Sequence, residues 1–535
     1  MRTVRDATLE ALRRLGTTTL FANPGSTEIP FLADLPDDFH FVLGLHESSV
    51  VGMATGYALA SGRPALVNLH TVAGLGNAVS ALATARQNRA PLVVLVGQQD
   101  RRHLALEPFL AGRLDDLAGS YPVSVQQPTR AADVPGAVVR AYHDAAGNPR
   151  GPALVIVPMD DWEHPADEAE VDAAALRVVR TAGVDEAALA EVADELSAAR
   201  SPLLVVGAGA DEPTTWRALT VLAERLGAPV WQEAFGARAG FPQDHPHFAG
   251  HLPASRDQLR TVFEGHDLVL VVGAPVFRQY PYRPGPLVPE GTRVVQLTED
   301  PAEAHRSPVD LSVLTPLSGF VAALAEKVSP RTGWVLPERT RPRVPPLDAG
   351  GPLLPEQLFA VLAERLPADT VVVEESPSSR SMLHALLPAR SPLGFLSAAN
   401  GGLGFAMPAA TGVRMAAPRR PVVCIVGDGS SLYSVQTLWS AARYGAGVLF
   451  VVLANGGYAI LDRLVEMHGN GGAKAPWPHF DQVDVATIAA GFGCRVRRVS
   501  EGGQLLQVLD EVLPGLAERT EPLVLVVDVS PGTTY

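Results

Sequence analysis

Short runs of β-branched and other apolar residues alternate with helical patterns from one end of the chain to the other. Runs such as residues 90–99, APLVVLVGQQ, are apolar over most of their length, as strands are when helices cover both faces of a parallel sheet. Parallel strands need long crossover connections, which the intervening helical segments supply. The pattern therefore predicts an α/β fold built on parallel sheets flanked by helices.

Two stretches with little regular pattern divide the chain into three units of similar kind. One is acidic and Ala-rich, around residues 162–175, and the other is the Pro- and Arg-rich segment 328–351. At 535 residues the chain is long enough to form several separate cores. We therefore predict three domains, at residues 1–165, 184–328 and 352–535.

The charge and the cysteine content exclude several classes of partner. A formal net charge of -14 argues against nucleic acid, because nucleic-acid binders usually present a basic face. Cys424 and Cys494 lie in apolar surroundings without paired spacing, so neither disulfides nor a metal cluster is implied. The N-terminus is typical of an amphipathic helix, and no apolar run reaches membrane-spanning length. We expect a soluble, cytoplasmic protein that acts on small molecules.

The third unit places polar residues directly after two apolar runs. Asp428 and Asn455 each follow such a run, and the carboxyl ends of parallel strands lie at one edge of a sheet, so both side chains can meet around one cation. Their oxygens, with a main-chain carbonyl such as that of Gly457, are ligands that Mg²⁺ accepts beside phosphate and water. Gly429 allows close approach of a ligand, and Ser430 caps a helix start that attracts phosphate. Each motif alone also fits an ordinary turn, so the pair carries the hypothesis.

The sequence GDGS at residues 427–430, followed by ANGG at residues 454–457, resembles the diphosphate- and Mg²⁺-binding motif of thiamine diphosphate-dependent enzymes. The usual motif has two asparagines where this chain has Ala454 and Asn455. Similarity to the benzoylformate decarboxylase branch of that family extends over nearly the whole chain, through FANPGSTEIPFL, LHESSVVGMATGYA, NLHTVAGLGNA, GAPVFRQY and NGGLGFAMPAA. The resemblance implies a pyrimidine-binding domain, a middle domain and a diphosphate-binding domain, in that order.

The cofactors that the resemblance implies are thiamine diphosphate and Mg²⁺, with Ca²⁺ as the alternative ion. The middle-domain run at residues 205–216, VVGAGADEPTTW, lacks a full Gly-x-Gly-x-x-Gly turn, so FAD is not expected. The implied metal ligands are Asp428, Asn455 and Gly457. The other implied cofactor-binding residues are Glu47, Ser378, Gly401, Leu403, Gly429, Ser430 and Tyr458.

Three further residues match catalytic positions of the family. Glu47 matches the glutamate that contacts the aminopyrimidine ring and tunes the basicity of the cofactor. Ser26 matches the serine that holds the carboxylate of a 2-oxo acid, and His70 matches a histidine that transfers protons, a task that suits an imidazole near neutral pH. Without the surrounding match, a surface carboxylate and a structural histidine would be the simpler interpretations.

The chain departs from the family pattern at Tyr280, where a second active-site histidine is expected. A tyrosine with a pKa near 10 donates a hydrogen bond but carries protons poorly at neutral pH. Arg380 is either solvated or directed inward, and in the second case the substrate would carry another acidic group. The implied substrate-pocket residues are Ser26, His70, Arg380, Ile460, Leu461 and Leu464.

The resemblance implies non-oxidative decarboxylation of a 2-oxo acid with an aromatic or apolar side chain, which gives an aldehyde and carbon dioxide. Two alternatives remain open: a carboligase of the acetolactate synthase type, and a non-catalytic cofactor-binding partner subunit. In the family, Glu47 and Asp428 of one site would come from different chains, so a homotetramer with active sites at the dimer interface is expected. The sequence names neither the exact 2-oxo acid nor the dominant reaction.

Overall fold

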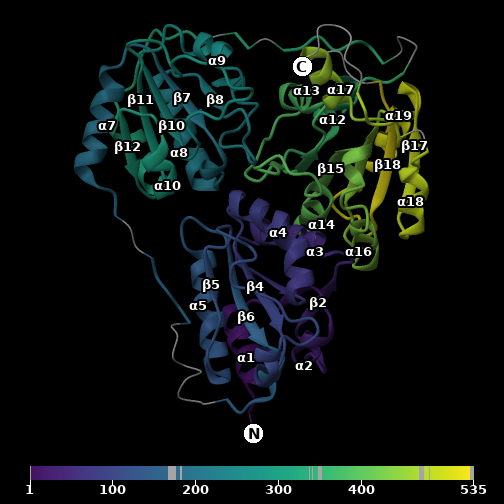
Figure 1. The fold of residues 1–535 in the computed structure, drawn as a ribbon. Helices are drawn as coiled ribbons and strands as arrows, with labels where there is room; N and C mark the ends of the chain where they lie inside the picture. The colour runs from purple at the N-terminus through teal and green to yellow at the C-terminus, as the bar shows by residue number, and fades with distance from the viewer. Residues whose placement is uncertain are drawn as a thin grey trace. The chain divides into compact units, whose positions relative to one another are not determined.

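The computed structural model describes residues 2–166, 176–180, 183–336, 338–339, 341–347, 352–468, 475–480 and 482–530. Most of the acidic stretch around residues 162–175 and part of segment 328–351 lie outside these residues. Within them the chain forms three six-stranded sheets with helices beside them (Figure 1). The predicted α/β class is confirmed. Over the same residues, no helix combines the length and the apolar character that a membrane span requires.

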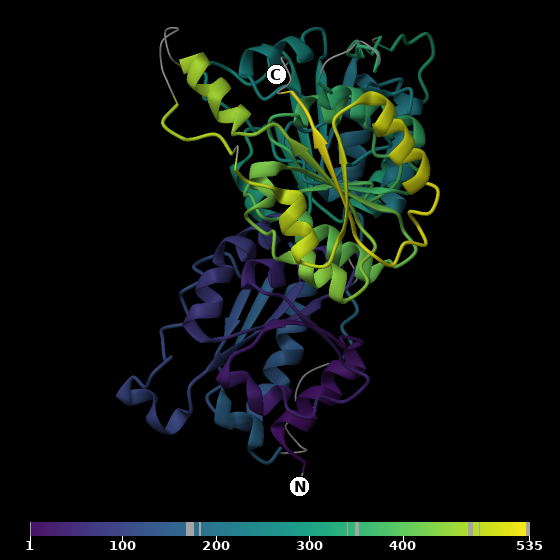
Figure 2. The ribbon, with the colours of Figure 1, turned by 90° about the vertical axis from the view of Figure 1, so that its right-hand side faces the viewer.

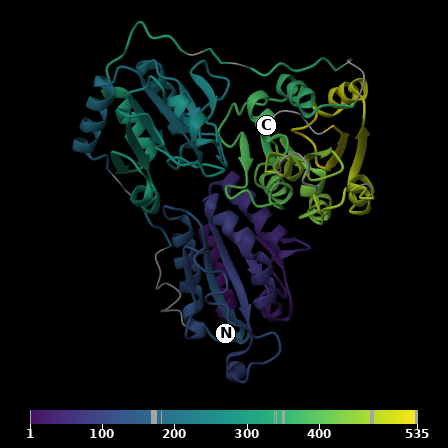
Figure 3. The same cartoon turned by 45° about the horizontal axis from the view of Figure 1, so that its top comes forward.

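The N-terminal sheet has the strand order β2-β1-β3-β4-β6-β5, and helices lie on both of its sides (Figure 3). Two separate clusters of buried apolar side chains pack against its two faces. Its strands are β1 (Thr19–Asn23), β2 (His40–Leu43), β3 (Ala65–Leu69), β4 (Leu92–Gln98), β5 (Ser124–Gln126) and β6 (Pro152–Pro158). Its helices are α1 (Val4–Leu15), η1 (Ser26–Glu28), α2 (Ile29–Leu32), α3 (Glu47–Ser61), α4 (Thr71–Gln87), η2 (Arg101–Leu106), η3 (Ala131–Asp133), α5 (Val134–Ala146) and η4 (Met159–Glu163).

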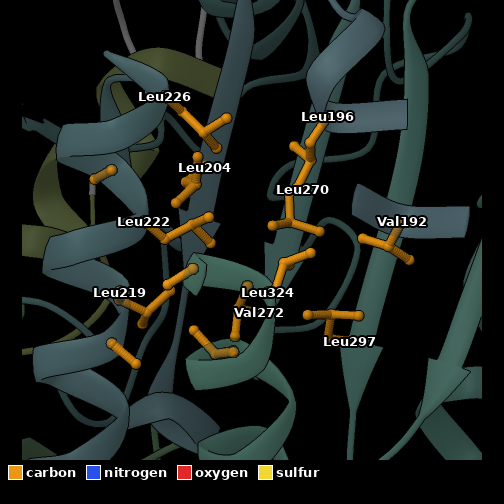
Figure 4. Close-up of a cluster of buried hydrophobic side chains, with 14 of the residues drawn as sticks. Val192, Leu196, Leu204, Leu219, Leu222, Leu226, Leu270, Val272, Leu297 and Leu324 are labelled. Atoms are coloured by element: carbon orange, nitrogen blue, oxygen red, sulfur yellow. The ribbon is translucent and has the colours of Figure 1, made fainter. Parts of the chain in front are cut away.

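The middle sheet has the order β12-β11-β10-β7-β8-β9. Figure 4 shows Leu204, Leu270 and Leu297 of its central strands packed against leucines of the covering helices, which forms the core of this region. Its strands are β7 (Pro202–Val206), β8 (Val230–Gln232), β9 (Phe248–His251), β10 (Leu268–Val272), β11 (Arg293–Thr298) and β12 (Leu311–Leu314). Its helices are α7 (Glu186–Ala198), η5 (Ala208–Ala210), α8 (Pro213–Leu226), α9 (Arg256–Phe263), α10 (Pro301–Arg306) and α11 (Leu317–Lys327).

The C-terminal sheet has the order β14-β13-β15-β16-β18-β17, and Figure 2 shows its yellow strands between helices. Its strands are β13 (Val371–Glu375), β14 (Phe395–Ser397), β15 (Val422–Gly427), β16 (Leu449–Ala454), β17 (Arg495–Val499) and β18 (Leu523–Asp528). Its helices are α12 (Pro355–Arg365), α13 (Arg380–Leu386), α14 (Ala406–Ala416), α15 (Asp428–Ser431), α16 (Thr437–Arg443), α17 (Ala459–His468), α18 (Val485–Gly491) and α19 (Gly502–Val512).

By its contacts the chain divides into two compact units. The first unit contains residues 1–179, 373–377 and 400–530, and the second contains residues 180–372 and 378–399 together with the chain end. Hydrogen bonds of the second unit explain why it includes part of the C-terminal sequence: the Ser397 N–H donates to the Ala237 carbonyl at 2.9 Å, and Gln243 and Ala389 exchange two hydrogen bonds. The boundaries at residues 165, 184, 328 and 352 stay a prediction.

Helices α3 and α14 pack closely within the first unit because small residues line their contact. A Cβ atom on Gly56 would lie 2.0 Å from the carbonyl oxygen of Ala409, and one on Gly412 would lie 1.8 Å from that of Met53. Backbone atoms cannot give way as a flexible side chain can. These glycines therefore set the distance between the two helices, and α3 carries Glu47 as its first residue.

We expect Gly56→Ala to lower the free energy of unfolding by about 1–3 kcal/mol, because the new methyl group overlaps the Ala409 carbonyl and forces the helices apart. Urea unfolding followed by circular dichroism measures this change. Gly503→Ala is the matched control, because Gly503 lies near the start of helix α19 with no heavy atom within 4 Å of its Cβ position. Equal stability of the two variants would contradict the steric role of Gly56.

Candidate active site

The strand order of the C-terminal sheet reverses between β13 and β15. The chain adds β14 on one side of β13, and then adds β15 on the other side. Ligands of open parallel sheets bind at such a reversal, beyond the carboxyl ends of the strands. Asp428 follows β15 at this edge, and Asn455 follows the neighbouring strand β16. The sequence-based expectation that these two residues lie in adjacent loops agrees with this geometry.

The carboxylate of Asp428 joins the two loops. One oxygen accepts a hydrogen bond from the Gly429 N–H at 2.7 Å, and the other accepts one from the Gly456 N–H at 2.7 Å. Burial raises the pKa of Asp428, and the backbone N–H donors oppose that shift. The Asn455 side-chain oxygen accepts from the Gly457 N–H at 3.1 Å. Two oxygen donors are therefore held at one corner of the sheet.

Aromatic residues cover this corner closely. The rings of Tyr458 and Phe480 meet edge to face at 4.7 Å, and the Phe480 N–H donates to the Gly456 carbonyl at 2.8 Å. A Cβ atom on Gly429 would lie 2.7 Å from the Phe480 ring, which explains why glycine is needed there. A side-chain hydrogen bond with Tyr433 raises the pKa of Tyr458. Phe480 was missed by sequence reasoning because it comes from a separate segment.

The loop before α14 carries Gly401 and Leu403. Gly401 is exposed with a φ of +69°, in the left-handed region that favours glycine, and Leu403 is half-buried. Ser430 is buried inside the short helix α15, whose N-cap residue is Gly427, so the predicted capping role of Ser430 is wrong. Ser378 is half-buried in the loop between β13 and α13. Cofactor contacts for these residues stay a prediction.

The N-terminal sheet reverses its order between β1 and β3, and Ser26 and His70 follow these two strands. Ser26 is exposed at the start of η1. The Nδ1 atom of His70 lies 2.9 Å from the Glu28 carboxylate, which also accepts from the Gly25 N–H at 2.7 Å. Glu28 is buried, and a Cβ on Gly25 would lie 2.4 Å from the imidazole Nδ1.

This pairing fixes the orientation of the His70 ring. A carboxylate acceptor favours the tautomer with the proton on Nδ1. Nε2 is then the ring nitrogen that can exchange a proton with a ligand. The following residue, Thr71, has a φ of +43°, an uncommon conformation for a β-branched residue at the strand-to-helix corner. Glu28 was missed by sequence reasoning, although its position two residues after Ser26 at a strand end was a usable signal.

Glu47 begins α3, with His46 as the N-cap residue. Its carboxylate accepts hydrogen bonds from the side-chain amides of Asn23 at 3.1 Å and Asn77 at 3.0 Å. Asn23 ends β1 and Asn77 lies on α4, so two elements hold this carboxylate. Both asparagines were missed: Asn23 stands at a strand end, which was a usable signal, whereas Asn77 lies inside a helix, where no such signal exists.

The other predicted pocket residues are distributed over both units. Ile460 and Leu464 are half-buried on α17 and Leu461 is exposed there, all in the first unit. Tyr280 and Arg380 belong to the second unit. Tyr280 is 60% exposed, and its N–H donates to the Ala254 carbonyl at 3.1 Å. Their roles toward a substrate stay predictions.

Comparison with known proteins gives matches to three family models. The N-terminal thiamine pyrophosphate-binding domain model matches residues 2–118, the central domain model matches residues 189–324, and the C-terminal thiamine pyrophosphate-binding domain model matches residues 378–527. A benzoylformate decarboxylase from Pseudomonas aeruginosa is 41% identical over 521 residues, which cover 96% of this chain and 97% of that protein. The chain belongs to the thiamine pyrophosphate enzyme family.

Other members of the family show how far the similarity extends. The solved structure of a thiamine diphosphate-dependent 4-hydroxybenzoylformate decarboxylase from Rhodococcus jostii RHA1 superposes with a TM-score of 0.94 at 36% identity, and covers 99% of this chain and 100% of that one. An acetolactate synthase large subunit from Parasynechococcus marenigrum is 30% identical over 84% of this chain and 75% of that protein. Both reaction types considered from the sequence thus have relatives in this family.

The residues at the β15–β16 corner fit a metal-bound diphosphate. Asp428 and Asn455 offer hard oxygen atoms, and Gly456, with a φ of +74°, turns the loop directly after Asn455. Throughout the described ranges, no group of three His, Cys, Asp or Glu side chains could hold a metal ion. The Asp428 carboxylate, the Asn455 amide oxygen and a main-chain carbonyl are hard oxygen ligands, and diphosphate oxygens suit the same cation.

The surroundings of Arg380 in this family member include an unusual histidine pair. The rings of His251 and His384 stack at 4.1 Å, and Nε2 of His384 is buried without a hydrogen-bond partner. Burial, and then the charge of Arg380 one turn earlier on α13, lowers the pKa of His384 to about 3. Burial also lowers the pKa of His251. Both imidazoles are therefore neutral in the folded protein near pH 7.

We expect acid to destabilise the second unit through this pair. Between pH 6.5 and about 3, His384 takes up a proton on unfolding that it does not carry when folded, so stability falls as the pH falls. The loss is about 1.4 kcal/mol per pH unit for one histidine. In His384→Gln this part of the slope disappears in urea unfolding between pH 6 and pH 5. His305→Gln, at an exposed position in the same unit, should keep the wild-type slope; a flattened slope there would contradict the assignment.

Proposed function

We propose that this chain is a thiamine diphosphate- and Mg²⁺-dependent, non-oxidative decarboxylase of a 2-oxo acid with an aromatic or apolar side chain, and that it releases an aldehyde and carbon dioxide. The observation that carries the proposal is the His70–Glu28 pair beside the exposed Ser26, in a chain 41% identical to a benzoylformate decarboxylase. A scaffold protein has no need for an imidazole oriented by a buried carboxylate.

Ser26 and His70 handle the substrate in this proposal. The Ser26 hydroxyl is exposed and donates a hydrogen bond to the substrate carboxylate. His70 gives or accepts a proton at Nε2 while Glu28 holds Nδ1, so the ring stays in one orientation during the transfer. The apolar side chains of α17, Ile460, Leu461 and Leu464, exclude water from the reacting atoms.

The remaining residues bind the cofactors. When bound, thiamine diphosphate supplies an electron sink for the electrons that carbon dioxide leaves behind. Glu47, held by Asn23 and Asn77, would hydrogen-bond to a nitrogen of its aminopyrimidine ring. Asp428, Asn455 and the Gly457 carbonyl would hold Mg²⁺, and the residues expected to bind the diphosphate are Ser378, Gly429, Ser430 and Tyr458. Gly401 and Leu403 contact the rest of the cofactor.

Carboligation is the second candidate, because an acetolactate synthase is among the relatives of this chain. Tyr280 also differs from the histidine expected for a benzoylformate decarboxylase, and tyrosine is the poorer proton carrier. A slow final proton transfer would leave time for a second carbonyl compound to react. The ratio of aldehyde to condensation product separates the two activities.

We also propose a homotetramer with a homodimer as its minimum, because the family places Glu47 and Asp428 of one site on different chains. Within one chain, Glu47 and Asp428 belong to the same compact unit, where α14 packs against both α3 and β15. Light scattering measures the assembly directly, and a fully active monomer would contradict this proposal.

For the reaction itself, we expect equal amounts of carbon dioxide and aldehyde from benzoylformate or a close analogue in the presence of both cofactors. A panel of 2-oxo acids, with and without added acceptor aldehyde, measures carbon dioxide and both organic products. His70→Ala should lower the rate by roughly 10²–10⁴-fold, because it removes a general acid and base. Tyr280→His, run on the same panel, should raise benzoylformate turnover. Absence of carbon dioxide from every acid would refute decarboxylation.

For the metal, we expect Asp428→Asn to weaken the binding of thiamine diphosphate roughly 10- to 100-fold in the presence of Mg²⁺, because the carboxylate that attracts the ion is lost. Titration calorimetry with and without Mg²⁺ measures the effect. Asp528→Asn is the matched control, since Asp528 is exposed and ends β18, the strand next to β16, at the same edge of the sheet. An equal loss in the control would show that Asp428 is not a specific ligand.

A further inference from the structure

Glu375, the last residue of β13, lies at the same strand-order reversal as Asp428 and is buried. Its carboxylate accepts three backbone hydrogen bonds, from the N–H groups of Gly404 at 2.7 Å, Phe405 at 2.7 Å and Ala406 at 2.8 Å. No role was expected for this residue from the sequence. Three short bonds to one loop nevertheless make it the main anchor of the chain before α14.

The carboxylate has no cationic partner within the described part of the chain. The titratable groups that interact electrostatically with it are Glu374, the preceding residue on β13, and the Cys424 thiol on β15. Burial raises the pKa of Glu375 to about 7, against the effect of the three N–H donors. Its ionised form matches three donors, whereas a protonated carboxyl group would direct its own O–H toward one of them.

The anchored loop connects two parts of the proposed site. Gly401 and Leu403 lie in the loop directly before the bonded amides, and Phe405, the N-cap residue of α14, has no side-chain cap of its own. Helix α14 in turn packs against α3, which begins with Glu47. Movement of the loop would therefore displace Leu403 and loosen the support of α3.

We propose that Glu375 is a positioning residue for the reaction: its ionised carboxylate holds the backbone of residues 401–406 so that Leu403 keeps a fixed place against the bound cofactor. This inference rests on the proposed function, because it gives Leu403 its role. It goes beyond that function by making Glu375 the residue on which the loop depends. A merely structural helix cap would stabilise α14 without linking the loop to catalysis.

The first measurement needs no substitution. Amide hydrogen exchange of residues 404–406 in the wild-type chain, corrected for the intrinsic exchange rate, reports how firmly the loop is held. We expect protection to fall about tenfold between pH 8 and pH 6, because the ionised fraction of a group with a pKa of about 7 falls by about that factor. Protection independent of pH over this range would overturn the inference.

The second measurement compares Glu375→Gln with Glu356→Gln, a control at another buried carboxyl group, on α12. The side-chain amide introduced by Glu375→Gln retains one acceptor oxygen and turns its own donors toward the N–H groups. We therefore expect faster exchange at residues 404–406, weaker thiamine diphosphate binding and a kcat at least tenfold lower. The wild-type loss of kcat toward pH 6 should be absent in this variant. In the control, exchange in the loop and the pH profile should remain as in the wild type.

Glu375→Asp provides the conservative variant if the Glu375→Gln variant does not fold. It keeps the charge, so we expect it to retain the pH dependence and to recover part of the cofactor affinity. Identical exchange, affinity and kcat in wild type and in both Glu375 variants would overturn the inference. If the wild type decarboxylates no 2-oxo acid, the proposed function fails, while exchange and cofactor affinity still test the anchoring role separately.

Discussion

The reversal of strand order within each sheet is the constraint on which the rest of the structure depends. At a reversal, the loops that follow two adjacent strands run to opposite sides of the sheet, and a crevice forms between them at the carboxyl ends of the strands. Ser26 and His70 border this crevice in the N-terminal sheet, and Glu375 and Asp428 border it in the C-terminal sheet. In the middle sheet a hydrogen bond joins the loops that follow β7 and β10 at the equivalent reversal: the Gly209 N–H donates to the Gly273 carbonyl at 2.8 Å.

Buried carboxylates are costly unless hydrogen bonds satisfy them, and four of those in the first unit, all near the proposed site, are satisfied in different ways. Glu28 accepts from an imidazole and a backbone amide, Glu47 from two asparagine amides, Glu375 from three backbone amides, and Asp428 from two backbone amides in separate loops. None of these partners is an arginine or a lysine. The arrangement holds the groups rigidly and leaves their negative charge without a neutralising cation, which suits sites that bind a metal ion or protonated ring atoms.

The central strands of all three sheets were predictable because helices cover both of their faces, so they are apolar without interruption. Strands β5, β8, β9, β12, β14 and β17 have no long apolar run to predict them, and each lies at or next to a sheet edge. Strand β17 is an example, because three of its five residues are exposed. A strand at the edge of a sheet is less covered than a central one, so its sequence needs no continuous apolar run. Likewise, the contact of Gly56 and Gly412 between two helices could not be recognised, because the atoms that exclude a side chain at each glycine belong to the other helix.

The sequence by itself determined the α/β class, the family and the strand-end residues Glu47, His70, Asp428 and Asn455, because strand periodicity and short motifs are local properties of the chain. Only the tertiary structure decided which groups hold those residues. Glu28 reaches His70 across 42 positions and Glu375 reaches Ala406 across 31, and the amides of Asn23 and Asn77 converge on Glu47 from different elements. Such pairs leave no periodic trace in the sequence, because their spacing is set by how strands and helices pack, and the physical requirement that a buried carboxylate find donors becomes visible only after folding.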